Sequence, residues 1–115
     1  PHRYTRTRDL FEDFVQILST VDVLILMDVY PAGETVITGA DGRALSRAIR
    51  MRAQVDPIFV DGWQELPTIL AGIVKPEDVI LTMGAGNVGQ FATQLPKLLT
   101  EALENRVSSP LPLLT

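Results

Sequence analysis

The sequence of 115 residues contains no cysteine. This absence excludes disulfide-stabilised scaffolds, thiolate metal sites and cysteine nucleophiles, and it suits a reducing compartment. His2 is the only histidine. A Ser-His-Asp triad is therefore excluded anywhere but at the N-terminus, and a metal site with two histidine ligands is excluded altogether.

Long apolar runs are lacking as well. The longest covers residues 23–27, far short of the roughly 20 residues that cross a bilayer, and no signal-peptide pattern is present. We therefore expect a cytoplasmic protein without a membrane partner. The formal charge of -4 also speaks against nucleic acid as a partner.

The chain has no phosphate loop of the form G-x-x-x-x-G-K-[ST]. Its only lysines are Lys75 and Lys97, and neither lies in a glycine-rich turn. If ATP is used, the main cradle for its phosphates does not lie on this chain.

What the chain does have is enough apolar material for one domain with a core, since 46% of its residues are hydrophobic. Periodicity predicts helices over residues 8–20, 43–53, 64–74 and 87–104 and buried strands over 21–30 and 57–60, while residues 76–83 are predicted to supply a turn and a third buried strand. Apolar strands that alternate with helices are typical of a parallel sheet covered on both faces. We predict an α/β fold: a three-layer, Rossmann-like parallel sheet that lacks its first strand, because the chain opens on a loop leading straight into a helix.

Several residues mark where the predicted helices begin or end. Asp41 is placed to cap the helix that follows the glycine-containing loop over 31–42, and Pro67 is expected in the first turn of its helix. Pro96 is expected to break or kink the last helix near Leu95. Residues 105–115, rich in proline and serine, are predicted to form a tail or linker after a domain over residues 1–104.

The stretch "TMGAGNVGQF" contains Gly84, Gly86 and Gly89 in G-x-G-x-x-G spacing after an apolar run. A dinucleotide site also needs a later strand ending in Asp or Glu, about 20 residues on, and none follows here. Two other interpretations stay open: a tight strand-to-helix turn, or a loop whose backbone N–H groups approach an anionic or polar ligand.

The stretch "HRYTRTRD" gathers His2, Arg3, Arg6 and Arg8 ahead of a predicted helix. Arginine forks match carboxylate and phosphate oxygens, and a helix start has free N–H groups that favour anions. The alternative is a solvated terminus. Asp28 and Glu34 flank "VYPAG" at the end of a predicted strand, which makes them candidates for holding Mg²⁺ or orienting an amine.

Five segments, "PHRYTRTRDLFEDF", "DVYPAGE", "GADGRALSRAIR", "VDPIFV" and "GAGNVG", resemble in this order the C-terminal domain of the Mur ligases, and most closely the alanine-adding members. The resemblance covers residues 1–104. It implies part of a cytoplasmic ATP-dependent carboxylate–amine ligase of peptidoglycan precursor synthesis. In that family a UDP-N-acetylmuramate carboxylate is activated as an acyl phosphate and attacked by the amine of L-alanine, while ATP and Mg²⁺ are held mainly by N-terminal and central domains that are absent here.

Carried over by position, the resemblance places His2, Arg3 and Arg6 near the amino acid and the reacting carboxyl group, with Gly84, Gly86 and Asn87 lining the same pocket. It implies no catalytic residue and no metal ligand on this chain alone, so we expect the fragment by itself to be inactive. Two alternatives remain: a stand-alone nucleotide- or dinucleotide-binding α/β module, and an interaction-only fragment that associates through an open sheet edge.

Overall fold

The fold is a small parallel sheet between two groups of helices. The computed structural model describes residues 1–84 and 87–108. In chain order the elements are α1 (Tyr4–Asp9), α2 (Phe11–Leu18), β1 (Ile25–Met27), α3 (Gly42–Met51), β2 (Ile58–Val60), the 3-10 turn η1 (Trp63–Glu65), α4 (Leu66–Ala71) and α5 (Val88–Ser108). β1 and β2 are parallel, with Ile25 opposite Ile58 and Met27 opposite Val60.

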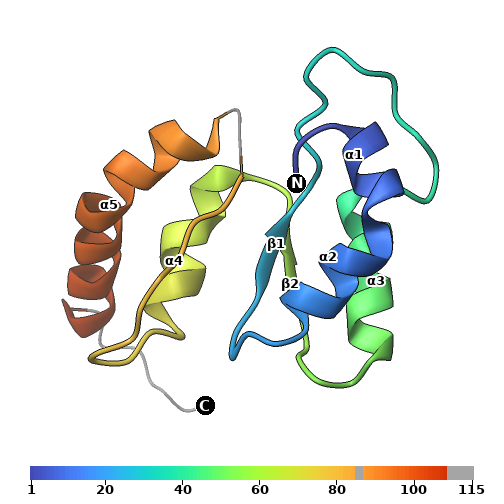
Figure 1. The fold of residues 1–115 in the computed structure, drawn as a ribbon. Coiled ribbons are helices and arrows are strands. Elements are labelled where there is room, and N and C mark those ends of the chain that lie inside the picture. Colours follow the sequence, from blue (N-terminus) through green and yellow to red (C-terminus); the bar gives the residue numbers. More distant parts are fainter. Residues whose placement is uncertain (85–86, 109–115) are drawn as a thin grey trace.

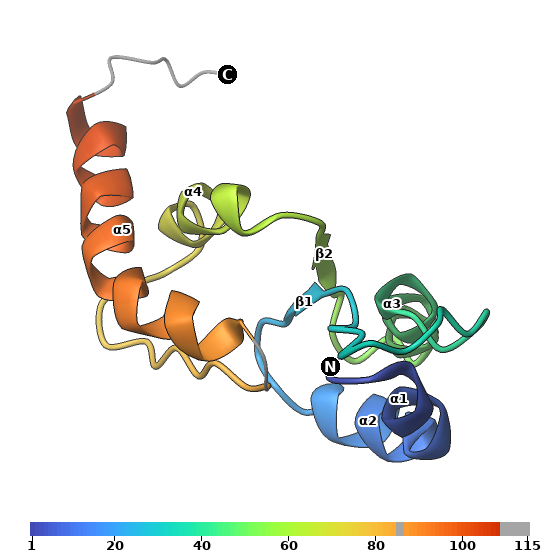
Figure 2. The same ribbon diagram turned by 90° about the horizontal axis from the view of Figure 1, so that it is seen from above.

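Helices α1, α2 and α3 cover one face of this sheet, and α4 and α5 cover the other (Figures 1 and 2). Each face has its own core. Leu26 joins the cluster with α2 and α3, whose buried members are Val15, Leu24, Leu26, Leu45 and Ile49. Its neighbours Ile25 and Met27 pack on the opposite cluster of Leu66, Leu70, Phe91 and Leu95, as the two-residue period of a strand requires. The predicted α/β class with helices on both faces is confirmed.

The third predicted strand, over residues 76–83, is wrong. Residues 76 and 77 form a turn and residues 78–83 form no strand, and Val79, Leu81 and Met83 are 91%, 77% and 68% exposed. β propensity reflects packing on neighbouring strands rather than an intrinsic backbone state, and in the described chain this segment has no strand beside it. Within those residues the sheet therefore has two strands.

The first predicted helix, over 8–20, begins earlier, at Tyr4, and is divided at Leu10 into α1 and α2 because Leu10 leaves the helical region (φ -112°, ψ 22°). The predicted cap is confirmed, since the Ala44 N–H donates to Asp41 Oδ1 at 2.8 Å. Pro67 lies in the first turn of α4, as expected.

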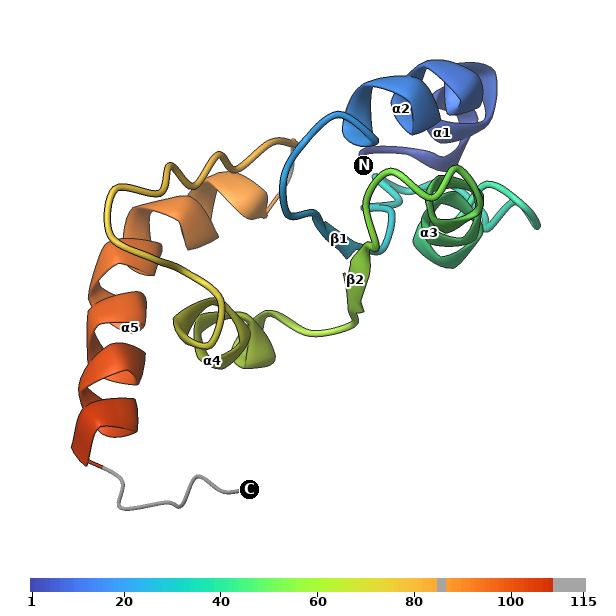
Figure 3. The same ribbon diagram turned by 90° about the horizontal axis from the view of Figure 1, so that it is seen from below.

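Of the break or kink predicted at Pro96, the break is wrong. α5 is continuous from Val88 to Ser108, with Pro96 inside it, although its ribbon bends in its first half (Figure 3). Helix α5 also extends four residues beyond the expected end at Glu104; residues 109–115 lie outside the described chain. Over residues 1–84 and 87–108, none of the helices has the length and apolar character that a membrane crossing needs.

Candidate functional site

The N-terminal segment lies beside the chain that leaves β1. The Tyr30 N–H donates to the Pro1 carbonyl at 2.9 Å and the Arg3 N–H donates to the Tyr30 carbonyl at 2.7 Å, which makes a parallel bridge between His2 and Tyr30. The segment is thereby held at the carboxyl end of the strands (Figure 1), where open α/β sheets bind their ligands.

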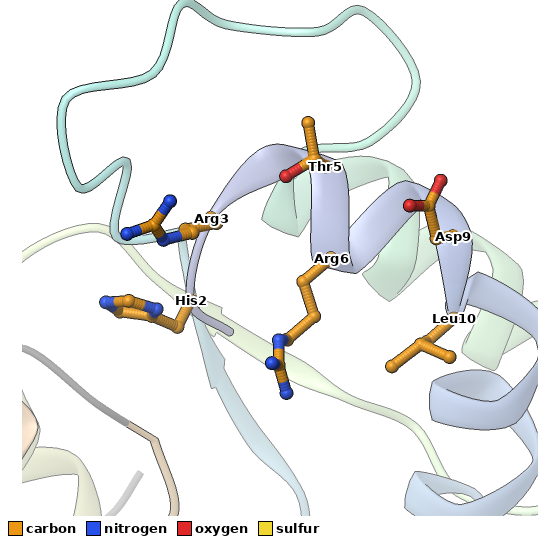
Figure 4. A pocket seen from close by; sticks show the side chains of 6 residues that line it. All are labelled: His2, Arg3, Thr5, Arg6, Asp9 and Leu10. Carbon is orange, nitrogen blue, oxygen red and sulfur yellow. The ribbon is translucent and has the colours of Figure 1, made fainter.

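An open depression of about 670 Å³ lies here, lined by His2, Arg3, Thr5, Arg6, Asp9 and Leu10. Arg6 and Leu10 project to the same side of α1 in Figure 4, and Thr5 and Asp9 project to the other side. A spacing of four residues places Arg6 and Leu10 on one helix face. Three of the residues singled out from the sequence, His2, Arg3 and Arg6, thus come together.

Two guanidinium groups at this depression, within the described residues, are held by no hydrogen bond and no ion pair. Arg3 and Arg6 are exposed, and within the described residues neither guanidinium makes a hydrogen bond or an ion pair. Arg8, the last basic residue of the stretch, instead pairs with Asp9 at 3.0 Å on the surface. Only part of the predicted cationic cluster is therefore available to an external anion.

Arg3 has a strained backbone, with φ 65° and ψ 136°. Its conformation is held from both sides: its N–H is bound to Tyr30, and its carbonyl accepts the Thr7 N–H at 3.2 Å and the Thr7 hydroxyl at 3.0 Å. Thr7 is fully buried. Such a conformation costs on the order of 1–3 kcal/mol, and residues of this kind cluster at functional sites.

Glu34 contacts the start of α1 from the loop after β1. Its Oε1 accepts the Thr5 N–H at 3.1 Å and its Oε2 accepts the Thr5 hydroxyl at 2.6 Å. The Thr5 hydroxyl and then the Thr5 N–H lower the pKa of Glu34, and the Arg3 charge adds to this. The expectation that the helix start offers free N–H groups to an external anion therefore needs correction, because a carboxylate of the same chain already occupies the Thr5 N–H.

Asp28, the other candidate carboxylate, ties the end of β1 to the start of α3. Its Oδ1 accepts the N–H groups of Val29 and Gly42, both at 2.8 Å, and it does not line the depression. In the described part of the chain, no three His, Asp or Glu side chains form a group that could hold a metal ion. The carboxylates of Asp28 and Glu34 already accept hydrogen bonds from their own chain and do not fit a Mg²⁺ site.

The glycine loop is placed only in part. Gly84 has φ 147° and Asn87 accepts the Phe91 N–H at the start of α5, whereas Gly86 lies outside the described residues. Neither Gly84 nor Asn87 lines the depression, although α5 begins at the same end of the sheet as the N-terminus (Figures 1 and 2). The dinucleotide pattern also lacks the strand that should lead directly into its loop, since residues 78–84 form no strand.

Sequence reasoning missed Tyr30, Thr5 and Thr7. The Tyr30 ring stacks on His2 with centroids 5.5 Å apart. A back-bonding threonine inside a helix is a recognisable local pattern, so Thr7 has a signal in the sequence. The pairing of Thr5 with Glu34, 29 residues away, has none.

No protein-family model matches the chain. Over 99 residues it is 66% identical to the UDP-N-acetylmuramate–L-alanine ligase of Methylococcus capsulatus (strain ATCC 33009 / NCIMB 11132 / Bath). Those residues amount to 86% of this chain and 21% of that protein, so the chain spans about a fifth of the relative's length.

Proposed function

Since this chain belongs to the Mur ligase family, we propose that it is the C-terminal domain of a UDP-N-acetylmuramate–L-alanine ligase of peptidoglycan precursor synthesis. The observation that carries the proposal is the 66% identity over 86% of the chain. The activity belongs to the whole ligase, a cytoplasmic enzyme whose other domains hold ATP and Mg²⁺. The partners of this domain are those domains, UDP-N-acetylmuramate and L-alanine.

The role of this chain is to position reactants. Arg3 and Arg6 present guanidinium forks at one depression, and such forks match the two oxygens of a carboxylate. They would hold the carboxylate of L-alanine and offset the negative charge of the muramoyl acyl phosphate. Positioning of this kind lowers a reaction barrier by several kcal/mol, so a domain can contribute to catalysis without supplying a nucleophile.

The remaining site residues complete the pocket. His2, stacked on Tyr30, forms its rim with a fixed ring orientation. Gly84 and Asn87 precede α5 at the same end of the sheet. With Gly86, which lies between them in the sequence, they would line the amino-acid side once the domains close on the substrates.

The test uses the full-length ligase that contains this chain, with Arg6→Ala compared with Arg8→Ala. Arg6→Ala is expected to lower kcat/KM for L-alanine by about 10-fold to 100-fold, because it removes a charge-assisted hydrogen bond. Arg8→Ala removes the same charge from a residue paired with Asp9 and should change kcat/KM less than about twofold. Equal effects of the two substitutions would contradict the proposed site, and failure of the parent enzyme to form an amide with L-alanine would contradict the function.

A further inference from the structure

We propose that Glu34 is a positioning residue that fixes the start of α1 and thereby holds Arg3 and Arg6 at the depression. The inference rests on the proposed function and deepens it. It assigns to Glu34 a role different from the metal or amine ligand that its place after β1 suggests.

The first support is the contact itself. Both carboxylate oxygens of Glu34 bind one residue, Thr5, which lies between Arg3 and Arg6. The contact joins a loop without helix or strand to a helix 29 residues earlier in the chain. Since α1 has six residues, it is too short to be stable without such outside support.

The second support is the uncapped helix start. The residue before α1 is Arg3, and its side chain makes no capping hydrogen bond. Glu34 supplies from the loop what an N-cap side chain supplies locally, because it accepts an N–H of the first helical turn. Without it, only the backbone bonds to Tyr30 and the contacts from Thr7 would hold Arg3 in its strained conformation.

The chemistry calls for a carboxylate. Thr5 offers two donors, its N–H and its hydroxyl, and a carboxylate accepts both at once. A glutamine has the same shape, but its NH₂ group cannot accept a hydrogen bond. Glu34→Gln therefore removes the charged acceptor of the Thr5 hydroxyl, which has to turn and accept from the NH₂ group instead of donating, while the size of the side chain stays unchanged. Thr5→Val removes the hydroxyl from the other side.

The experiment combines kinetics and amide hydrogen exchange on the full-length ligase. Glu34→Gln and Thr5→Val are each expected to lower kcat/KM for L-alanine by about 10-fold, with KM for ATP changed less than about twofold. The double variant should lose little more than either single variant, because both remove the same contact. The control is Glu12→Gln, an exposed carboxylate in the first turn of α2, which should leave the kinetics unchanged.

The pH profile separates positioning from a loss of fold. The pKa of Glu34 lies below its ordinary value of 4.5. The ionised carboxylate therefore holds Thr5 at pH values above this lowered pKa and releases it as the pH falls through it. Protonation of the L-alanine amine lowers kcat/KM with falling pH in both enzymes, and the parent should show an additional loss, as Glu34 is protonated, that Glu34→Gln lacks. The exchange of α1 amides should be faster in Glu34→Gln than in Glu12→Gln.

The outcomes distinguish the two proposals. An active ligase in which Glu34→Gln changes neither kinetics nor exchange overturns the positioning role and leaves the function standing. Faster exchange in α1 with unchanged kinetics also overturns it. If the parent ligase does not use L-alanine, the proposed function fails. Separately, if the α1 amides of Glu34→Gln exchange at the parent rate, Glu34 does not anchor α1.

Discussion

Arg3 occupies a backbone conformation that glycine adopts at little cost and that an arginine or alanine adopts only with strain. We expect Arg3→Gly to be more stable to urea than Arg3→Ala by about 1 kcal/mol, while both lower the activity of the full ligase because both lose the guanidinium. Equal stability of the two variants would mean that Arg3 relaxes in solution.

Gly42 and Gly89 form a matched pair at the starts of two helices. A Cβ at Gly42 would lie 2.8 Å from the Asp28 Cα and 2.9 Å from the Met27 carbonyl oxygen, both backbone atoms, whereas a Cβ at Gly89 meets nothing within 4 Å. Gly42→Ala should therefore lower the free energy of unfolding by roughly 1–3 kcal/mol. Gly89→Ala should raise it by up to about 1 kcal/mol. Urea denaturation measures both changes. A Gly42→Ala variant as stable as the parent would show that β1 and α3 are not packed as closely as these distances indicate.

At this scale, local chemistry could be predicted and distant contacts could not. The Asp41 cap could be predicted locally, because its side chain needs only an N–H three residues later in the chain. The hydrogen bond from the Ala44 N–H is present. The Glu34–Thr5 contact depends on where a loop returns, which no local pattern encodes. The roles of His2, Arg3 and Arg6 stay predictions, although the fold brings their side chains to one depression.

At the scale of the elements, residues 78–84 differ most from the sequence pattern, because they form neither a helix nor a strand. Val79 and Leu81 are largely exposed, so the double substitution Val79→Lys and Leu81→Lys should change the stability of this chain by less than about 0.5 kcal/mol. In a buried strand the same lysines would cost several kcal/mol. A large loss on urea denaturation would show that the segment pairs with a strand in solution, as its sequence predicts.

Elements with one buried face could be predicted, because that face gives the sequence a periodic apolar pattern. Elements whose formation requires a particular neighbouring element could not. Helix α3 forms where the apolar spacing places it, whereas α4 covers only Leu66–Ala71 of the predicted range 64–74 and follows a 3-10 turn. Helix α5 passes through Pro96 because Pro96 is exposed, while Leu95, Leu98 and Leu99 pack on the second cluster around it. The free energy of that packing outweighs the one backbone hydrogen bond that the proline removes.

For the whole molecule, the two apolar clusters have unequal ties to the sheet. The first contains Leu26 and is closed by α2 and α3, whereas the second consists of side chains from α4 and α5 that meet the sheet through the half-buried Ile25 and Met27. Trp63, the only tryptophan, packs on Phe91 with ring centroids 4.5 Å apart. Its fluorescence therefore reports on the second cluster alone.

This division has a consequence for how the chain opens. Cooperative units with few ties to the rest of a protein exchange and unfold first. We expect the urea transition followed by Trp63 fluorescence to have a lower midpoint than the one followed by circular dichroism, which averages over all helices. Coincident transitions would show a single two-state unit. With separate transitions, α4 and α5 would detach while residues 1–60 keep Arg3 and Arg6 in place, so the depression at α1 would outlast the loss of one of the two helical layers.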